Sequence, residues 1–387
     1  MQYMLKDERA IRIYETLSVA AVGRVPLMTA GSFRETDCRN LFRFLITREG
    51  RPLLRYLDED EFGSSSENSD YEKFLRLCDS IQDLSGSAYY SDVRLAMELL
   101  LPGGSVLSSQ DAEHLWSSAI PKLKELTEEA LSKPFSVVSL PDATQFLFPS
   151  MDALRQCETF DCYADLYRAS LGSTPAVMLR LPCVKRFCAP NPYRVGEGYL
   201  SLRNAASPSE CDLLTEEATF VSSQLIRLTG EYCKERNIPM LLCGSCDPKL
   251  LRDIISYLKR QDRLPRLILS VNNREELADF EHSGALSLAE GVVPAFDRLS
   301  VSNTELRTVF ESICCAYPIG KILFLPVSGI PGTPGTALEA RILWERILRT
   351  VADVFSDWIN NGDLEDEAAA IRLGQKILFD TANSVFC

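Results

Sequence analysis

The alternation of short apolar runs with helical stretches constrains the fold of this chain most strongly. From about residue 135 onward, each apolar run of four to six residues precedes a segment with helical periodicity. Strands that alternate with helices in this way are typical of parallel βαβ units. The predicted strands begin near Val25, Phe135, Val177, Met240, Leu267, Val292 and Ile322. Seven predicted strands are one fewer than the eight of a (β/α)8 TIM-type barrel. An open doubly wound sheet fits the alternation nearly as well.

The segment between the first two predicted strands has a different character. Residues 37–131 carry helical patterns and no clear strand, with a helix expected over 110–131. We therefore predict an α/β barrel with a mostly helical insertion after its first strand. Residues 1–36 begin the barrel, 37–131 form the insertion, and 132–387 complete the barrel and end in C-terminal helices. A chain of 387 residues is long enough for one such barrel.

Helix boundary signals are clearest in the second half of the chain. Residues 248–260, 274–283 and 304–315 each lie between two predicted strands and show helical periodicity. Two further helices, 336–360 and 365–384, are expected to close the chain. A helix running over 151–170 is expected after the second strand.

Charge and composition exclude several classes of partner. The formal net charge of −13 opposes binding to nucleic acid and to anionic membrane surfaces. No run approaches 18 apolar residues, so no membrane span is expected. The 13 cysteines are odd in number and scattered, unlike a disulfide framework, and no secretory signal opens the chain. We expect a cytoplasmic protein, and a homo-oligomer is compatible with this composition.

Histidine is scarce. The chain has two histidines, His114 and His282, which lie far apart in sequence. Histidine is the commonest zinc ligand and the commonest general base. A metal centre that needs several histidines is therefore excluded. A metal centre remains possible where other side chains supply the ligands. We expect His114 to pack on a helix and His282 to end one, where a cation interacts well with the helix dipole.

The C-terminal helices carry a family resemblance. Residues 338–343 (Leu-Glu-Ala-Arg-Ile-Leu), 358–363 (Trp-Ile-Asn-Asn-Gly-Asp) and 377–386 (Ile-Leu-Phe-Asp-Thr-Ala-Asn-Ser-Val-Phe) are similar to the end of the uronate isomerases, a branch of the amidohydrolases. Members of that family finish with Arg-Arg-Ile-Leu, Trp-Val-x-x-Gly and Asn-Asn-Ala-x-x-Tyr-Phe. The Thr381-Ala382-Asn383 order departs from the last of these. A second match covers 228–246 and a third covers 264–272, and weaker similarity covers 107–116. The resemblance implies a barrel, a sugar-acid substrate and aldose–ketose isomerisation at a divalent metal.

The metal ligands of the family are missing from the matching positions. The family has His-x-His at the end of its first strand, where this chain has Met28-Thr29-Ala30-Gly31-Ser32-Phe33. Cys243 stands where the family has a metal-region histidine. The last strand reads Leu325-Pro326-Val327-Ser328-Gly329 in place of Thr-Asp-Ser-Arg. The metal site as the family builds it is therefore lost, and we predict no bound cofactor. A divalent metal fits only a rebuilt site.

Two cysteines after one predicted strand are candidates for chemistry. Cys243-Gly244-Ser245-Cys246 precedes a helix that Pro248 opens. A helix N-terminus favours the thiolate form, so the pair is a candidate redox site, and half of a soft metal site is a second interpretation. Two loop thiols without chemistry are the simplest interpretation in a chain with 13 cysteines.

Basic and amide side chains follow other strands and are candidate pocket residues for an acidic sugar. Arginine suits bidentate binding of a carboxylate, and barrel active sites lie at the carboxyl ends of the strands. Ordinary surface charge and helix capping are the competing interpretations. The candidate pocket residues are Arg180, Lys185, Arg186, Asn272 and Arg274.

Three hypotheses of function follow. The first is a uronate isomerase-like barrel that has lost its metal site and binds a sugar acid. The second is an active isomerase or hydrolase with a rebuilt site, in which Cys243, Asp247 and Asp297 supply ligands or acid and base groups. The third is a thiol-redox protein that uses Cys243 and Cys246.

Overall fold

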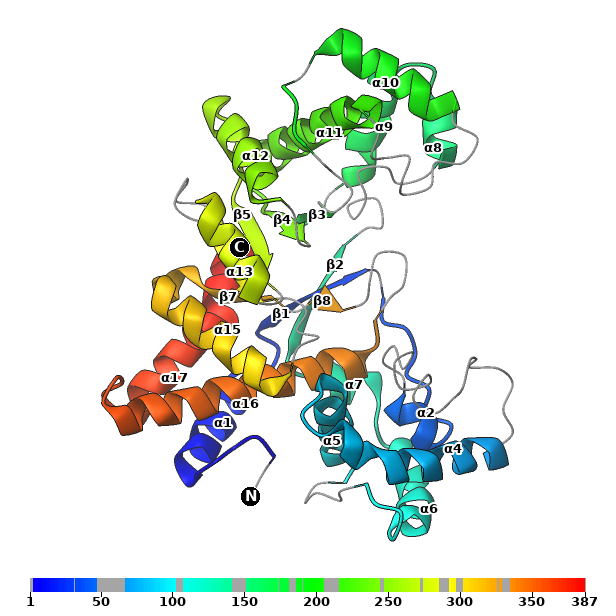
Figure 1. The fold of residues 1–387 in the computed structure, drawn as a ribbon, viewed down its shortest axis with the longest axis vertical. Helices are drawn as coiled ribbons and strands as arrows, with labels where there is room; N and C mark the ends of the chain where they lie inside the picture. Colours follow the sequence, from blue (N-terminus) through cyan, green and yellow to red (C-terminus); the bar gives the residue numbers. More distant parts are fainter. Residues whose placement is uncertain are drawn as a thin grey trace.

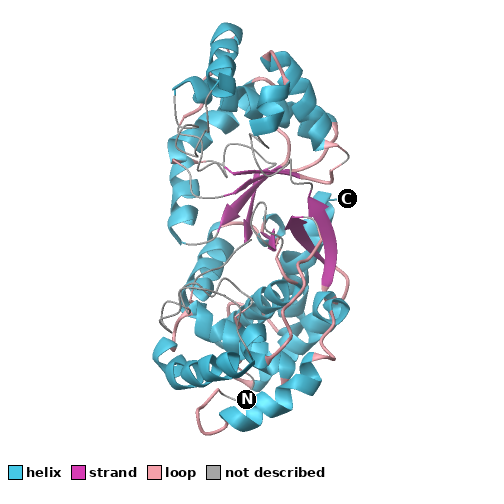
Figure 2. Ribbon diagram, turned by 90° about the vertical axis from the view of Figure 1, so that its right-hand side faces the viewer, coloured by secondary structure: helices cyan, strands magenta, loops and turns pink. Residues whose placement is uncertain are grey.

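The computed structural model describes most of the chain. The described ranges are 3–30, 32–46, 67–101, 107–140, 151–172, 174–180, 186–189, 191–204, 216–243, 247–271, 274–284, 292–296, 302–325, 327–328 and 335–386. Strands lie at the middle of the molecule, between two groups of helices (Figures 1 and 2). None of the helices in these ranges is long and apolar enough to span a membrane.

All strand pairs in the described ranges are parallel, as the alternating pattern predicts. The strands are β1 (Val25–Ala30), β2 (Phe135–Leu140), β3 (Val177–Arg180), β4 (Met240–Cys243), β5 (Leu267–Val271), β6 (Val292–Phe296), β7 (Leu323–Phe324) and β8 (Val327–Ser328). They form one sheet in the order β2-β1-β8 and another in the order β3-β4-β5-β6-β7. An α/β fold is thereby confirmed.

One pass of the chain belongs to both sheets. Leu323 and Phe324 in β7 pair with β6, and Val327 in β8, three positions after Phe324, pairs with Met28 of β1. The seventh predicted strand therefore continues from one sheet into the other. Within the described ranges, seven passes of the chain supply the eight strands.

The strands are apolar because both of their faces are covered. Met240 and Leu242 of β4 belong to the large core between strands and helices, whereas Leu241 belongs to a separate cluster on the opposite face. That opposite face draws residues from both sheets and from the last helix. The cluster consists of Met28, Ala176, Leu241, Ile268, Leu323, Leu325 and Ala382.

The helices follow the predicted alternation. Before β2 lie α1 (Glu8–Ala20), α2 (Leu41–Leu45), α4 (Glu67–Ser80), a 3-10 turn η1 (Ile81–Leu84), α5 (Ala88–Leu100), α6 (Ala112–Leu123) and α7 (Glu128–Ser132). Between β2 and β6 lie α8 (Met151–Gln156), α9 (Phe160–Leu171), α10 (Pro192–Asn204), α11 (Glu216–Glu235), α12 (Pro248–Arg260) and α13 (Arg274–Ser283). After β6 come α15 (Asn303–Ala316), η4 (Ile319–Lys321), α16 (Ala337–Asn361), α17 (Glu367–Gln375), a π-helical turn η5 (Lys376–Asp380) and α18 (Thr381–Phe386).

Two predicted helices are broken, and one helix was not predicted. The helix expected over 110–131 is α6 and α7, because Thr127 caps a new helix by accepting the N–H of Ala130. The helix expected over 151–170 is α8 and α9, where Thr159 caps α9 in the same way. Helix α10 begins at Pro192 and was absent from the predicted elements.

The helices between β1 and β2 have a core of their own. Buried side chains from α2, α4, α5, α6 and α7 form one apolar cluster, in which Ala337, Leu338 and Ile342 of α16 are the residues from outside this segment. Helix α16 thus joins this helical unit to the strands (Figure 1). Its start is firmly defined, because Thr336 and Glu339 form a reciprocal capping box.

Helix α18 covers the amino-terminal ends of the strands. Ala382 is fully buried in the cluster that contains Leu241 and Ile268. Arg266, which precedes β5, donates hydrogen bonds to the carbonyls of Ser384 (3.2 Å) and Val385 (3.0 Å). Asn383 donates to the carbonyl of Arg24, which precedes β1. Helix α18 therefore lies at the amino-terminal ends of β1 and β5.

Candidate functional site

Two of the predicted site residues occupy paired positions at the ends of neighbouring strands. Arg180 ends β3 and Cys243 ends β4, and the two are register partners in the parallel ladder. The structure therefore brings Arg180 and Cys243 to one location, at the carboxyl-terminal edge of the sheet.

The carboxylate of Asp247 has a structural role. It is the N-cap of α12, and its Oδ1 accepts the backbone N–H of Lys249 at 2.8 Å. Pro248 occupies the first helical position, where a missing N–H has no cost. Asp247 is exposed. Helix capping accounts for an aspartate at this position, and no catalytic role is needed to explain it.

The other described candidates lie on the surface near strand ends. Arg186 is exposed in the segment 186–189, which is held to α11 by a hydrogen bond from the N–H of Cys188 to Oγ of Ser223 (3.0 Å). Arg274 is exposed at the first position of α13, three residues after Val271, the last residue of β5. The remaining candidates, Lys185, Cys246, Asn272 and Asp297, lie outside the described residues.

Both histidines lie on helices, away from the strand ends. His114 is exposed on α6. His282 is exposed in the last turn of α13, where its Nδ1 lies 2.7 Å from the carbonyl oxygen of Ala278. The residues present therefore do not fit the histidine-based metal centre of the uronate isomerases. Within the described ranges, no group of three or more His, Cys, Asp or Glu side chains could hold a metal ion.

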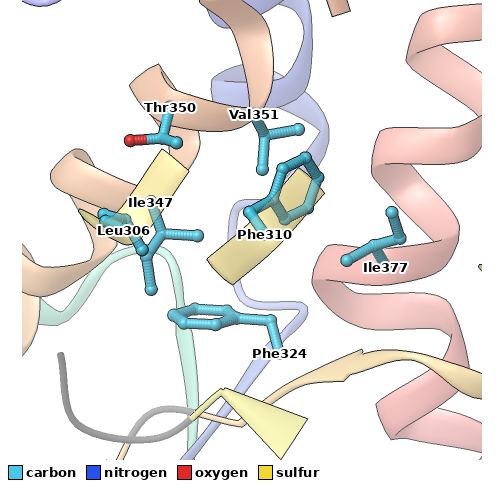
Figure 3. Close-up of a pocket in the computed structure, with 7 residues that line it drawn as sticks. All are labelled: Leu306, Phe310, Phe324, Ile347, Thr350, Val351 and Ile377. Carbon is cyan, nitrogen blue, oxygen red and sulfur yellow. The ribbon is translucent and has the colours of Figure 1, made fainter. Parts of the chain in front are cut away.

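An apolar pocket lies behind β7, on the helix side of the strands (Figure 3). Its volume is about 10 Å³ and it is lined by Leu306, Phe310, Phe324, Ile347, Thr350, Val351 and Ile377. A second pocket of about 10 Å³ lies within the helical unit, between η1 and α5. Each has room for about one water molecule, whereas ligand sites enclose about 300–1,000 Å³. These two pockets are packing gaps rather than substrate sites.

Two cysteines beside the break between α8 and α9 were not singled out from the sequence. Cys157 follows the end of α8 and is buried, and Cys162 lies in the first turn of α9 and is exposed. Burial raises the pKa of the Cys157 thiol to about 11. A signal for the helix start between them was Thr159, which caps α9.

Solved structures share the fold of this chain along almost its whole length. Uronate isomerase from Thermotoga maritima has a TM-score of 0.72 at 12% identity, with 100% of this chain and 98% of that chain covered. Glucuronate isomerase from Caulobacter crescentus has a TM-score of 0.68 at 9% identity, with 99% and 96% covered. No protein-family model and no curated protein matches the sequence. The resemblance predicted from the C-terminal motifs is confirmed at the level of the fold: this chain has, from end to end, the fold of the uronate isomerases.

Proposed function

We propose that the two sheets are the two parts of one (β/α)8-type barrel, with residues 37–131 inserted after the first strand. The shared pass through β7 and β8 supports this arrangement. So does the inner cluster, in which Met28 from one sheet packs with Leu241 and Ile268 from the other. An open doubly wound sheet would cover that face with several helices, whereas α18 is the helix that contributes to this cluster.

We further propose that this barrel binds a sugar acid at the carboxyl ends of its strands and does so without a catalytic metal. The observation that carries the proposal is the match to uronate isomerases over the full chain, in a protein whose two histidines both lie on helices. A fold can persist after its metal ligands are replaced, because barrel stability and barrel chemistry reside at opposite ends of the strands.

Arginine would supply the recognition of the acid. A guanidinium binds a carboxylate through two parallel hydrogen bonds, which gives both charge and orientation. Arg180 ends β3, and Arg186 and Arg274 lie beyond the ends of β3 and β5. Lys185 and Asn272 complete the proposed set. The chain carries an overall charge of −13, so local positive side chains are needed to attract an anion.

A rebuilt catalytic site is the alternative that one specific observation favours. Arg180 and Cys243 are register partners in the strand ladder. A cation close to this thiol would favour the thiolate, which is both a base and a soft metal ligand. Asp247 and Asp297 would be the further acid and base groups. Isomerisation between an aldose and a ketose moves a proton between adjacent carbons, so this alternative requires a base at the substrate. A redox role, in which Cys243 acts together with Cys246, is a separate hypothesis for the same thiol.

The metal content of the purified untagged protein, together with an isomerase assay, tests the proposal. Plasma mass spectrometry on protein prepared without added metal is expected to find no stoichiometric Zn, Mn, Fe or Ni. Incubation with glucuronate is expected to yield no ketose. About one metal ion per chain, with conversion of glucuronate that a chelator abolishes, would establish the rebuilt site instead. Variant Cys243→Ser would then lose the metal, whereas Cys315→Ser, at an exposed cysteine on α15, would retain it.

A further inference from the structure

The segment before α1 joins the helical unit to the strand-bearing part of the chain. Tyr3 packs against the apolar core of the helical unit, whereas Leu5 is buried in the large core between strands and helices, with 2% of its surface exposed. Met4 between them has a φ of 68°, in the left-handed region that residues other than glycine rarely adopt. Such a backbone persists where the surrounding contacts fix it. The turn at Met4 thus sends two nearby side chains into two different cores.

Tyr3 is held by side chains from three helices. Its backbone N–H donates to Oε1 of Glu98 on α5 (3.2 Å), and its carbonyl accepts from Nη1 of Arg349 on α16 (3.0 Å). Its hydroxyl lies 3.0 Å from Oγ of Ser91 on α5, and Nδ2 of Asn303 on α15 donates to both of these oxygens. Tyr3 therefore connects α5 of the helical unit to α15 and α16.

The other end of the segment is fixed to α16. The backbone N–H of Lys6 donates to Oδ1 of Asp353 (3.3 Å), and the ammonium of Lys6 lies 3.0 Å from Oδ2 of the same carboxylate. Asp7 accepts a hydrogen bond from the hydroxyl of Ser356 (2.9 Å) and caps α1. Residues Tyr3–Asp7, which we call the latch, therefore run from α16 to the helical unit.

The helical unit has the features of a segment that opens by itself. It has an apolar core of its own, to which the rest of the chain adds Ala337, Leu338 and Ile342 of α16 as buried residues. Proteins open locally in such contiguous units at a lower free-energy cost than global unfolding. Residues 32–40 lead from the carboxyl end of β1 into α2, so opening of the helical unit also moves the segment that follows β1.

We propose that the latch holds the helical unit closed, and that its release lets α2–α7 open while the strand-bearing part stays folded. The left-handed backbone at Met4 favours release, and the hydrogen bonds of Tyr3 oppose it. The population of the open state is therefore set by a residue outside the helical unit. The segment after β1 lies at the strand ends where barrel sites are built, so the latch is a conformational control on that side of the protein.

Two buried native cysteines report the opening. Cys78 lies in the core of the helical unit, with 3% of its surface exposed, and Cys233 on α11 is fully buried in the large core. The folded full-length protein is treated with excess iodoacetamide for increasing times, quenched and digested with trypsin. Cys78 and Cys233 are the single cysteines of the peptides 77–94 and 228–234, so mass spectrometry gives the alkylation rate of each. Tyr3→Ala is expected to accelerate alkylation of Cys78 about tenfold or more and to leave that of Cys233 unchanged.

Matched variants separate the latch from a general loss of stability. Tyr3→Phe keeps the ring and the backbone contacts, and it is expected to accelerate alkylation of Cys78 less than Tyr3→Ala does. Leu17→Ala truncates a fully buried leucine of α1 that packs on Gly374 of α17, and it is expected to accelerate alkylation of Cys233 at least as much as that of Cys78.

Two results for Tyr3→Ala would overturn the proposal: an unchanged rate at Cys78, or equal acceleration at Cys78 and Cys233. Selective acceleration at Cys78 in Leu17→Ala would overturn it as well, because opening of the helical unit would then depend on packing around α1 in general and not on the latch.

Discussion

The guanidinium of Arg346 and the carboxylate of Asp92 meet inside the protein, with Nη1 3.4 Å from Oδ1. Arg346 lies on α16 and is fully buried, and Asp92 lies on α5 of the helical unit and is 5% exposed. A second, partly buried contact lies nearby, where Arg349 donates to Glu98 at 2.5 Å and to the backbone carbonyl of Tyr3 at 3.0 Å. Ion pairs from one face of α16 thus fix the helical unit against the strand-bearing part of the chain.

Removing Arg346 should destabilise the protein strongly. In Arg346→Ala the buried carboxylate of Asp92 loses its ion pair with this cation, and breaking a buried ion pair costs about 3 kcal/mol or more. Urea unfolding followed by circular dichroism measures the loss. The double variant Arg346→Met with Asp92→Leu should recover most of it, since a buried ion pair can be replaced by apolar side chains of similar size.

A surface pair provides the control for that experiment. Arg168 and Asp165 lie 3.1 Å apart on α9, with 46% and 79% of their side chains exposed. Arg168→Ala should change the free energy of unfolding by less than about 0.5 kcal/mol. If Arg346→Ala and Arg168→Ala lowered the free energy of unfolding equally, the buried ion pair would contribute no more to stability than the exposed one, contrary to this prediction.

Acid should destabilise the junction of α1, α15 and α16. Burial alone would raise the pKa of Asp357, but hydrogen bonds from Arg307 (2.6 Å) and Lys6 (3.2 Å) outweigh it and lower that pKa below 3.8. The pKa of Asp7 is lowered in the same sense, since the N–H of Ala10 and the hydroxyl of Ser356 outweigh its burial.

The sign of the pH effect follows from these lowered values. The unfolded chain takes up protons near the ordinary value of 3.8, before the folded protein does, so stability is fully present above that value and is lost as pH falls through the folded pKa. Urea midpoints measured from neutral pH down to about pH 3 should therefore decline below about pH 4. Asp357→Asn should be less stable at neutral pH and should show a shallower decline. If the urea midpoints of the wild type and of Asp357→Asn fell in parallel with pH, this account would be contradicted.

The contact between Arg266 and the end of the chain should control the order of α18. Arg266→Ala removes hydrogen bonds to the carbonyls of Ser384 and Val385, which we expect to cost about 1–2 kcal/mol. Hydrogen–deuterium exchange should become faster in Thr381–Phe386 and stay unchanged in α17. Arg260→Ala, at an exposed arginine on α12, is the matched control and should leave both segments as they are. Faster exchange throughout the protein would mean that the effect is global and not local to α18.

Strand positions were predictable because buried parallel strands are continuous apolar runs. Each of the seven predicted runs contains or overlaps a strand, and the predicted helices 248–260 and 274–283 agree with α12 and α13 residue for residue. The Asp247-Pro248 start made the first of these clear. The division of the last run into β7 and β8 could not be predicted, because it depends on which neighbour each residue pairs with.

The missed features depend on local breaks and on packing in three dimensions. Helix α10 begins at Pro192 and contains Gly196 and Gly198, which favour a loop by composition. Its buried residues Val195, Tyr199 and Leu202 have helical spacing and were the signal for it. The pairing of Arg180 with Cys243 follows from register, which a single sequence does not contain.

Binding of a sugar acid in the absence of metal tests the central claim most directly. Isothermal titration calorimetry of D-glucuronate into protein treated with a chelator should show saturable binding near one site per chain. Arg180→Ala should lose that binding while Arg168→Ala retains it, and neutral glucose should bind neither protein. Glucuronate binding that appears after a divalent metal is restored, or that is absent under both conditions, would contradict the account.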